Sequence, residues 1–144
     1  MIETADLRKR IRQVIDEAKQ VAATHRADAA RGAASFEPFA AAVAAPVFRA
    51  VAGVLKAEGF PFHVATPAGA VRLEPERGGA DDAIELRLDT ARYPVAVVGR
   101  VQFTHGRHVE EDEQILCEVH ELEQVTTDQV LGFVLRALPL FVRR

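Results

Sequence analysis

The stretch QFTHGRHVEEDEQ, residues 102–114, holds the side chains of this sequence that are best suited to bind a metal or to move a proton. His105 and His108 flank a two-residue Gly-Arg segment, and four consecutive acidic residues follow at 110–113. Imidazole nitrogens and carboxylate oxygens are common metal ligands, and both groups exchange protons. The stretch is therefore a candidate site for a small metal-dependent or acid–base enzyme, with His105 and His108 as the candidate metal ligands.

The same stretch also has the pattern of a hairpin tip. A two-residue turn at Gly106–Arg107, of type II′, would place His105 directly opposite His108, with Cβ atoms about 5 Å apart. The apolar residues of both flanking strands, however, fall on odd-numbered positions, so this turn would pair the core face of one strand with the charged face of the other. We therefore expect either a β-bulge within 109–113 or a three-residue loop, 106–108, that separates the histidines.

Other catalytic chemistry has little support. Ser35 is the only serine and lies in a loop-like stretch, so a serine-nucleophile triad has almost no residues to draw on. The single cysteine, Cys117, alternates with apolar residues, which is typical of a small buried side chain and gives no disulfide framework. His63 and His120 each fall on the polar side of an expected strand, where a histidine is usually a surface residue.

The composition is that of an ordinary soluble globular domain, with 49% apolar and 27% charged residues among 144 and a net charge of −3. A chain of this length buries about 70% of its unfolded surface, so it needs neither disulfides nor a metal to fold. No leader-like segment opens the sequence, and no apolar run approaches the roughly 20 residues that cross a bilayer. We therefore expect a cytoplasmic protein without a membrane-spanning segment or a cofactor.

The N-terminal segment has a narrow apolar stripe whose spacing alternates between four and three residues, close to the repeat of a helix–helix seam. We expect Thr4 to cap a helix whose regular spacing runs to about Arg26. The periodicity is then lost, and we expect the helix to end near Gly32. A stripe this narrow suits an arm that packs on a partner, and a homodimer is the expected assembly. The stripe consists of Leu7, Ile11, Val14, Ala18, Val21 and His25, and the candidate partner-binding residues are Leu7, Ile11, Val14 and Val21.

Charge is unevenly distributed along the chain. Residues 7–31 carry seven basic and three acidic side chains, whereas residues 109–124 carry seven acidic side chains and no Lys or Arg. Such blocks can attract one another within a fold, across a dimer or toward another partner. The basic residues at 8–12 could contact phosphates, but Asp16, Glu17 and the net negative charge argue against a nucleic-acid interface.

The remaining segments predict a second helix, a sheet and a closing helix. Helical periodicity resumes near Glu37, and Pro46 predicts a kink or short break at 44–45 before a helix that ends at Gly59. Alternating apolar residues from Phe60 to Val119 predict five short strands with hairpin-length connections, hence an antiparallel meander. A final helix, capped by Thr127 or Asp128 and ended or bent by Pro139, would cover the sheet.

The polar face of this sheet is predicted to be charge-matched. If Leu88 pairs with Val97, Glu85 pairs with Arg100, which could also reach Glu118 from the other side. Such a row is usually a solvated surface, and the alternative is the floor of a groove for a polar ligand.

The sequence therefore predicts an α+β fold, with a helical arm at 1–31 and a single domain at 32–144. The expected function is that of a non-catalytic interaction or small-molecule-binding domain. The alternatives are an enzyme that uses the His105/His108 tip and a nucleic-acid contact through the basic helix.

Overall fold

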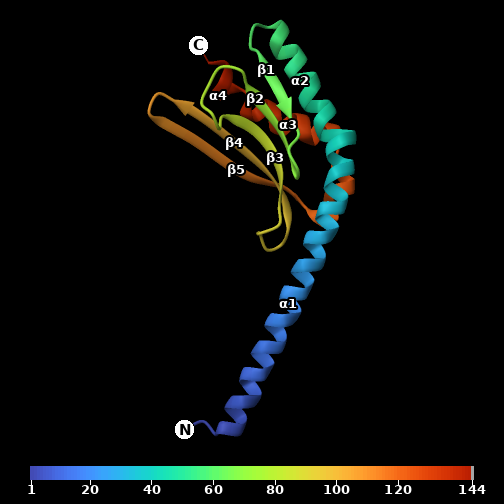
Figure 1. The fold of residues 1–144 in the computed structure, drawn as a ribbon, viewed down its shortest axis with the longest axis vertical. Coiled ribbons are helices and arrows are strands. Elements are labelled where there is room, and N and C mark those ends of the chain that lie inside the picture. Colours follow the sequence, from blue (N-terminus) through green and yellow to red (C-terminus); the bar gives the residue numbers. More distant parts are fainter. Residues whose placement is uncertain (144) are drawn as a thin grey trace.

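The protein has an α+β fold in which one long N-terminal helix leads into a five-stranded antiparallel sheet covered by C-terminal helices (Figure 1). The computed structural model describes residues 1–143, so Arg144, the end of the predicted domain, lies outside the described residues. The predicted fold class is confirmed. The helical elements are α1 (Thr4–Phe39), the π-helical turn η1 (Ala40–Ala44), α2 (Ala45–Ala57), the 3-10 helix η2 (Val119–Gln124), α3 (Thr127–Ala137) and α4 (Pro139–Val142).

The first helix does not end near Gly32, so that prediction is wrong. Gly32 is buried within α1, where a Cβ atom would lie 3.0 Å from Val119 Cγ2 and 3.1 Å from Leu88 Cδ1. The absence of a side chain at Gly32 lets the helix approach the sheet closely. In the sequence alone, a glycine at this position is equally typical of a helix end. The predicted cap is also wrong, since Glu3 is the N-cap residue without a side-chain hydrogen bond and Thr4 is already helical.

The predicted kink before Pro46 exists as the π-helical turn η1, which directly precedes α2. Proline lacks an amide hydrogen and its ring clashes with the carbonyl four residues earlier, so a wider turn at this point keeps the helix continuous. The predicted C-terminal glycine is confirmed, because Gly59, with a φ of 90°, follows Glu58, the C-cap residue of α2.

The helical segment Thr4–Ala57 is, among the described residues, the one segment long and apolar enough in composition to cross a membrane. This finding differs from the expectation that no apolar run approaches that length, because the kink does not interrupt the helix. In this fold 44% of the apolar window is buried inside the protein, and the core helix of a soluble protein meets the same criteria.

The sheet is a meander in which each strand pairs with its neighbours in sequence, as predicted. The predicted register between the third and fourth strands is confirmed, since Leu88 lies opposite Val97 and Glu85 opposite Arg100. The strands are β1 (Phe62–Ala65), β2 (Ala70–Pro75), β3 (Ala83–Asp89), β4 (Ala96–His105) and β5 (His108–Glu118).

The β4–β5 hairpin combines a two-residue turn with a β-bulge. His105 pairs with His108 across Gly106, whose φ of 61° suits the first central position of a type II′ turn. The register then shifts, because Val98 pairs with Ile115 but Val97 pairs with Cys117, which leaves residue 116 as the extra one. The predicted requirement for a bulge beside a two-residue turn is therefore confirmed, but its predicted position within 109–113 and the alternative three-residue loop are both wrong.

The bulge changes which residues of β5 face the core. Cys117 is buried, as expected, whereas Ile115 is 53% exposed and not on the core face as its odd number suggested. Between the turn and the bulge, the side chains at 108–113 are all exposed, so most of β5 extends beyond the core.

The core lies between the sheet and the helices α2 and α3. Phe133 of α3 lies over Gly99 of β4 so closely that a Cβ atom at Gly99 would come within 2.5 Å of the ring. Helix α3 is capped by Thr126, whose hydroxyl accepts a hydrogen bond from the Gln129 amide at 3.2 Å, one residue earlier than predicted. Pro139 separates α3 from α4, as expected.

Candidate functional sites

The N-terminal part of α1 extends from the rest of the molecule as a free helix (Figure 1). Every residue from 1 to 21 is exposed, and we call residues 1–21 the arm. The large apolar side chains along its helical part are between 43% and 64% exposed. They include all four predicted partner-binding residues and one that the narrow stripe had missed, Ile15: the set is Leu7, Ile11, Val14, Ile15 and Val21.

Local interactions support the helical conformation of the arm but do not cover its apolar side chains. Arg10 Nε lies 3.2 Å from Asp6 Oδ2, and Gln13 Nε2 donates to Glu17 Oε1 at 3.4 Å, both at a spacing of four residues. Such pairs contribute about 0.2–0.5 kcal/mol each to a helix. Most of the stability of a helix in a protein comes from packing of one face, and within the described residues no packing covers the apolar side chains of the arm.

We define the body of the protein as the described residues from 25 onward, so that residues 22–24 connect it to the arm. Its first residue, His25, contacts the segment before β4. The His25 ring stacks on Tyr93 with ring centroids 3.8 Å apart, and its Nε2 lies 3.2 Å from the carbonyl oxygen of Arg92. The last member of the predicted stripe is therefore turned toward its own chain. Of the predicted arm at 1–31, the residues from 25 onward therefore belong to the body, where His25, Asp28 and Ala29 are partly buried.

The predicted metal ligands His105 and His108 face one another at an exposed hairpin tip. They are directly paired across the turn, and the residues from 105 to 113 are exposed on both sides of it. The tip projects from the sheet (Figure 1). Neither histidine belongs to a group of three close metal-ligating side chains among residues 1–143.

The structure does bring together one group of three such side chains, within the described part of the chain, which sequence reasoning missed. Ligand atoms of Glu118, His120 and Glu121 lie within 4.8 Å of one another, with His120 Nδ1 3.4 Å from Glu118 Oε2. The spacing E-x-H-E at 118–121 was a signal for this group. Both carboxylates already have a structural role, because each accepts a hydrogen bond from a backbone amide at the start of η2.

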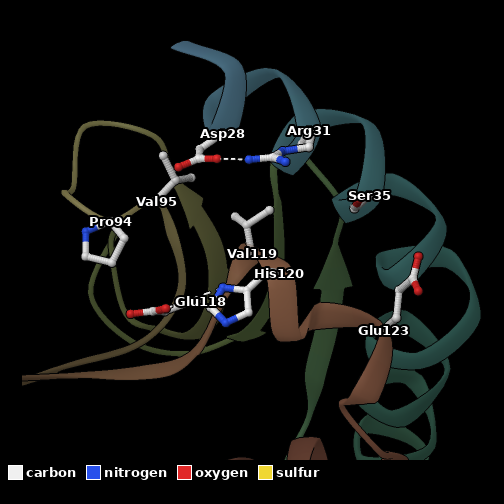
Figure 2. Close-up of a pocket in the computed structure, with 9 residues that line it drawn as sticks. All are labelled: Asp28, Arg31, Ser35, Pro94, Val95, Glu118, Val119, His120 and Glu123. Atoms are coloured by element: carbon white, nitrogen blue, oxygen red, sulfur yellow. Dashed lines mark hydrogen bonds and ion pairs between the residues drawn. The ribbon is translucent and has the colours of Figure 1, made fainter. Parts of the chain in front are cut away.

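This group borders a hollow of about 320 Å³ between α1 and the start of η2 (Figure 2). Asp28 and Arg31 of α1 form an ion pair above it, and Glu118 and His120 lie on the opposite side. The carboxylates and the imidazole give this wall the chemistry to hold a cation. Its side chains are mostly exposed, so water competes for each of them.

A second hollow, of about 250 Å³, lies on the polar face of the sheet around a buried carboxylate. The side chain of Glu85 is only 3% exposed and accepts hydrogen bonds from Arg87, at 2.9 Å from its Nε, and from Arg72. Arg72 also donates to Glu74 at 3.0 Å. Sequence reasoning found Glu85 but expected Arg100 as its partner, and the actual partners are the arginines on its own and the adjacent strand.

Burial alone would raise the pKa of Glu85, but the hydrogen bonds from Arg87 and Arg72 outweigh it and hold the pKa below its ordinary value. Burial alone would lower the pKa of Arg72, but its hydrogen bonds to Glu74 and Glu85 outweigh burial and raise the pKa above the usual range. Glu85 is therefore a carboxylate held ionised by its neighbours. A general base would instead need a pKa near the working pH.

The β2–β3 loop borders this polar hollow through Asp81, and the next residue, Asp82, connects the loop to β4. Asp82 is buried and accepts hydrogen bonds from the Thr104 amide at 2.9 Å, the Thr104 hydroxyl at 2.8 Å and the Gly79 amide at 3.0 Å. Arg100 lies on the open side, where its guanidinium is 3.3 Å from Glu111 and does not reach Glu118 as predicted. The hollow could hold a polar molecule, but its positive charges are already paired with carboxylates.

The cysteine is not a nucleophile in this fold. Cys117 is buried, and burial, with a smaller contribution from Glu121, raises its pKa to about 11. A reactive cysteine needs an exposed thiolate next to a positive charge.

Comparison of the chain with protein-family models, with curated proteins and with solved structures finds no match. The function is therefore inferred from the surfaces described above.

Proposed function

We propose that this protein is a non-catalytic interaction module whose arm binds a second copy of the same chain. The observation that carries the proposal is that every residue from 1 to 21 is exposed, including five large apolar side chains on the helical part. Exposed apolar surface of this kind is unfavourable in water and usually marks an interaction site. The alternation of four and three residues along it matches the packing surface of another helix with the same repeat.

A second copy is the partner best suited to this stripe. The arm carries basic residues at 8–12 and acidic residues at 16 and 17, so two arms can offer each other opposite charges as well as apolar side chains. Nucleic acid would use only the basic residues and would leave the apolar stripe exposed. We place the module in the cytoplasm, in agreement with a composition that calls for neither a disulfide nor a metal.

Enzymatic activity has less support. The His105/His108 tip is exposed, the carboxylate of Glu85 is held in ion pairs, and the thiol of Cys117 is buried. A small polar molecule could occupy the hollow beside Glu85 as an additional ligand of the same module.

Sedimentation velocity on the intact chain and on two variants tests the proposal. Val14→Asp places a charge in the centre of the stripe, and we expect it to convert a concentration-dependent dimer into a monomer. Gln20→Asp adds the same charge to an exposed position outside the stripe and should leave the dimer in place. Equal association of the intact chain and the Val14→Asp variant, with the body folded in both, would rule out the arm as the interface.

A further inference from the structure

We infer that the two arms pair antiparallel, with Ile11 of each chain against the partner's Val14, so that the two bodies lie at opposite ends of the helix pair. This inference rests on the proposed self-association and adds the orientation and register of the arms. Three observations carry it: the order of side-chain sizes along the stripe, the positions of the charges beside it and the length of the arm.

The order of sizes favours the antiparallel arrangement. In an antiparallel pair, the numbers of the stripe residues that face each other have a constant sum, which is 25 for Ile11 against the partner's Val14. Side chains on the two flanks of the stripe then meet at sums of 27 and 23. Leu7 then lies against the partner's Ala18, so a large side chain fills the space beside a small one. A parallel pair would instead place Ala18 against the partner's Ala18 and leave a gap. It would also put valines at positions where parallel two-stranded coils favour leucine.

The charges beside the stripe point to the same orientation. Arg10 and Glu17 occupy equivalent positions on one flank of the stripe, one heptad apart. In the antiparallel register Arg10 lies beside the partner's Glu17, and the symmetry of the dimer repeats the pair. In a parallel dimer Arg10 would lie beside the partner's Ile15, and the basic residues at 8–12 of both chains would be side by side. Arg10 can keep its bond to Asp6, because a guanidinium has five donors.

The opposite flank is compatible with this register. Ile15, which is exposed in the single chain, lies there beside the partner's Arg8. The long aliphatic stem of an arginine can cover an isoleucine while its charged end remains in water. The two flanks therefore differ, with an ion pair on one and an apolar contact on the other.

The length of the arm matches the overlap that this register requires. His25 is stacked on Tyr93, so the stripe is open to a partner only up to about residue 24. With a sum of 25, the partner's Met1 lies at the level of Thr24, directly before the body begins. The two helices, which both begin at Thr4, then overlap from Thr4 to Val21 over about 27 Å, and this overlap ends before residue 25, where the body begins.

Two charge-reversed variants test the orientation. Arg10→Glu places a carboxylate beside the partner's Glu17 on both sides of the symmetric pair, and Glu17→Arg likewise brings two arginines together at each site. We expect each variant homodimer to be about tenfold weaker than the unmodified one. Mixed in equal amounts, the two variants restore an attractive pair, and native mass spectrometry should show mainly the heterodimer.

The matched control pair is Lys9→Glu with Asp16→Lys. These substitutions change the net charge of each chain by the same amounts, but positions 9 and 16 lie on the helix face opposite the stripe. This mixture should give close to the statistical one-half share of heterodimer. Heterodimer enrichment that is the same in both mixtures would overturn the register.

Disulfide trapping distinguishes a dimer with the other orientation from a chain that does not dimerise. In the antiparallel register, an Ile11→Cys chain mixed with a Val14→Cys chain should form a cross-linked heterodimer under mild oxidation. A parallel pair would instead link two Ile11→Cys chains to each other and would overturn the orientation while keeping the dimer. Sedimentation of the intact chain as a monomer at every concentration would overturn both.

Discussion

The ring of His25 stacks on the ring of Tyr93 at a centroid distance of 3.8 Å and an interplanar angle of 19°. This contact joins the last residue of the apolar stripe to the loop before β4, and it marks the end of the free arm. Because the helix is continuous across this point, the contact also fixes the direction in which the arm leaves the body.

Replacing His25 with alanine should lower the free energy of unfolding by about 1 kcal/mol, because it removes the aromatic stack and the contact to the Arg92 carbonyl. Dimerisation should persist, since His25 lies outside the proposed overlap. Urea denaturation and sedimentation measure the two quantities. His108→Ala, at the exposed tip, is the control and should leave stability within about 0.5 kcal/mol.

Gly32 and Gly53 both lie in the long helical segment, but their surroundings predict opposite effects of alanine. At Gly32 the added Cβ would press on Val119 and Leu88, so Gly32→Ala should destabilise the protein by about 1–2 kcal/mol despite the better helix propensity of alanine. At Gly53 no atom lies within 4 Å of the added Cβ, and Gly53→Ala should stabilise by up to about 1 kcal/mol. Thermal unfolding of the pair checks the signs, and a gain in stability at Gly32 would contradict the close packing.

Removing the buried charge of Glu85 should destabilise the fold more than removing an exposed one. Glu85→Gln leaves Arg72 and Arg87 without their common partner, and we expect a loss of about 2–3 kcal/mol, because both guanidiniums can still reach water. Glu111→Gln, whose pair with Arg100 is about half exposed, should change stability by less than about 0.5 kcal/mol. Similar losses in both variants, measured by urea denaturation, would show that the network around Glu85 adds no stability of its own.

The lowered pKa of Glu85 also predicts how stability depends on pH. Its carboxylate is ionised more readily in the folded than in the unfolded chain, so its contribution is present above the ordinary pKa of a glutamate, about 4.3. That contribution is lost as the pH falls below this value and through the lower pKa of the folded state. Unfolding followed between about pH 6 and pH 3 should therefore show a smaller loss of stability in Glu85→Gln than in the unmodified protein.

Cys117 should react with thiol reagents only when the protein unfolds. Its side chain is buried, and a pKa of about 11 leaves little thiolate at mildly alkaline pH. We expect modification by Ellman's reagent to be slow in buffer and fast in denaturant. Rapid modification of the folded protein at the same pH would show that the end of β5 opens readily.

The predictions that succeeded depended on periodic patterns. Alternation of apolar residues is enough to define strands such as β3, and the register of Glu85 against Arg100 followed from counting along the hairpin. The helical conformation of residues 7–21 also followed from a periodic pattern, because residues spaced by four and three positions fall on one face of a helix. Ile15 was missed because it lies beside the stripe and not on it.

The predictions that failed concern close contacts between distant segments. Gly32 looks like a helix stop until Val119 and Leu88 are placed against it, and residue 116 shows nothing in its type that marks it as a bulge. The partners of Glu85 were mispredicted for the same reason, because they depend on contacts between separate strands. Which arginine reaches a buried carboxylate depends on side-chain directions across three strands, and the sequence pattern contains only their parity.

The mass of the unmodified chain in solution tests the central claim most directly. Static light scattering across a range of concentrations should show a mass that rises from that of one chain, 15.7 kDa, toward twice that value and then levels off. A mass that stays at 15.7 kDa up to the highest soluble concentration would contradict self-association through the arm.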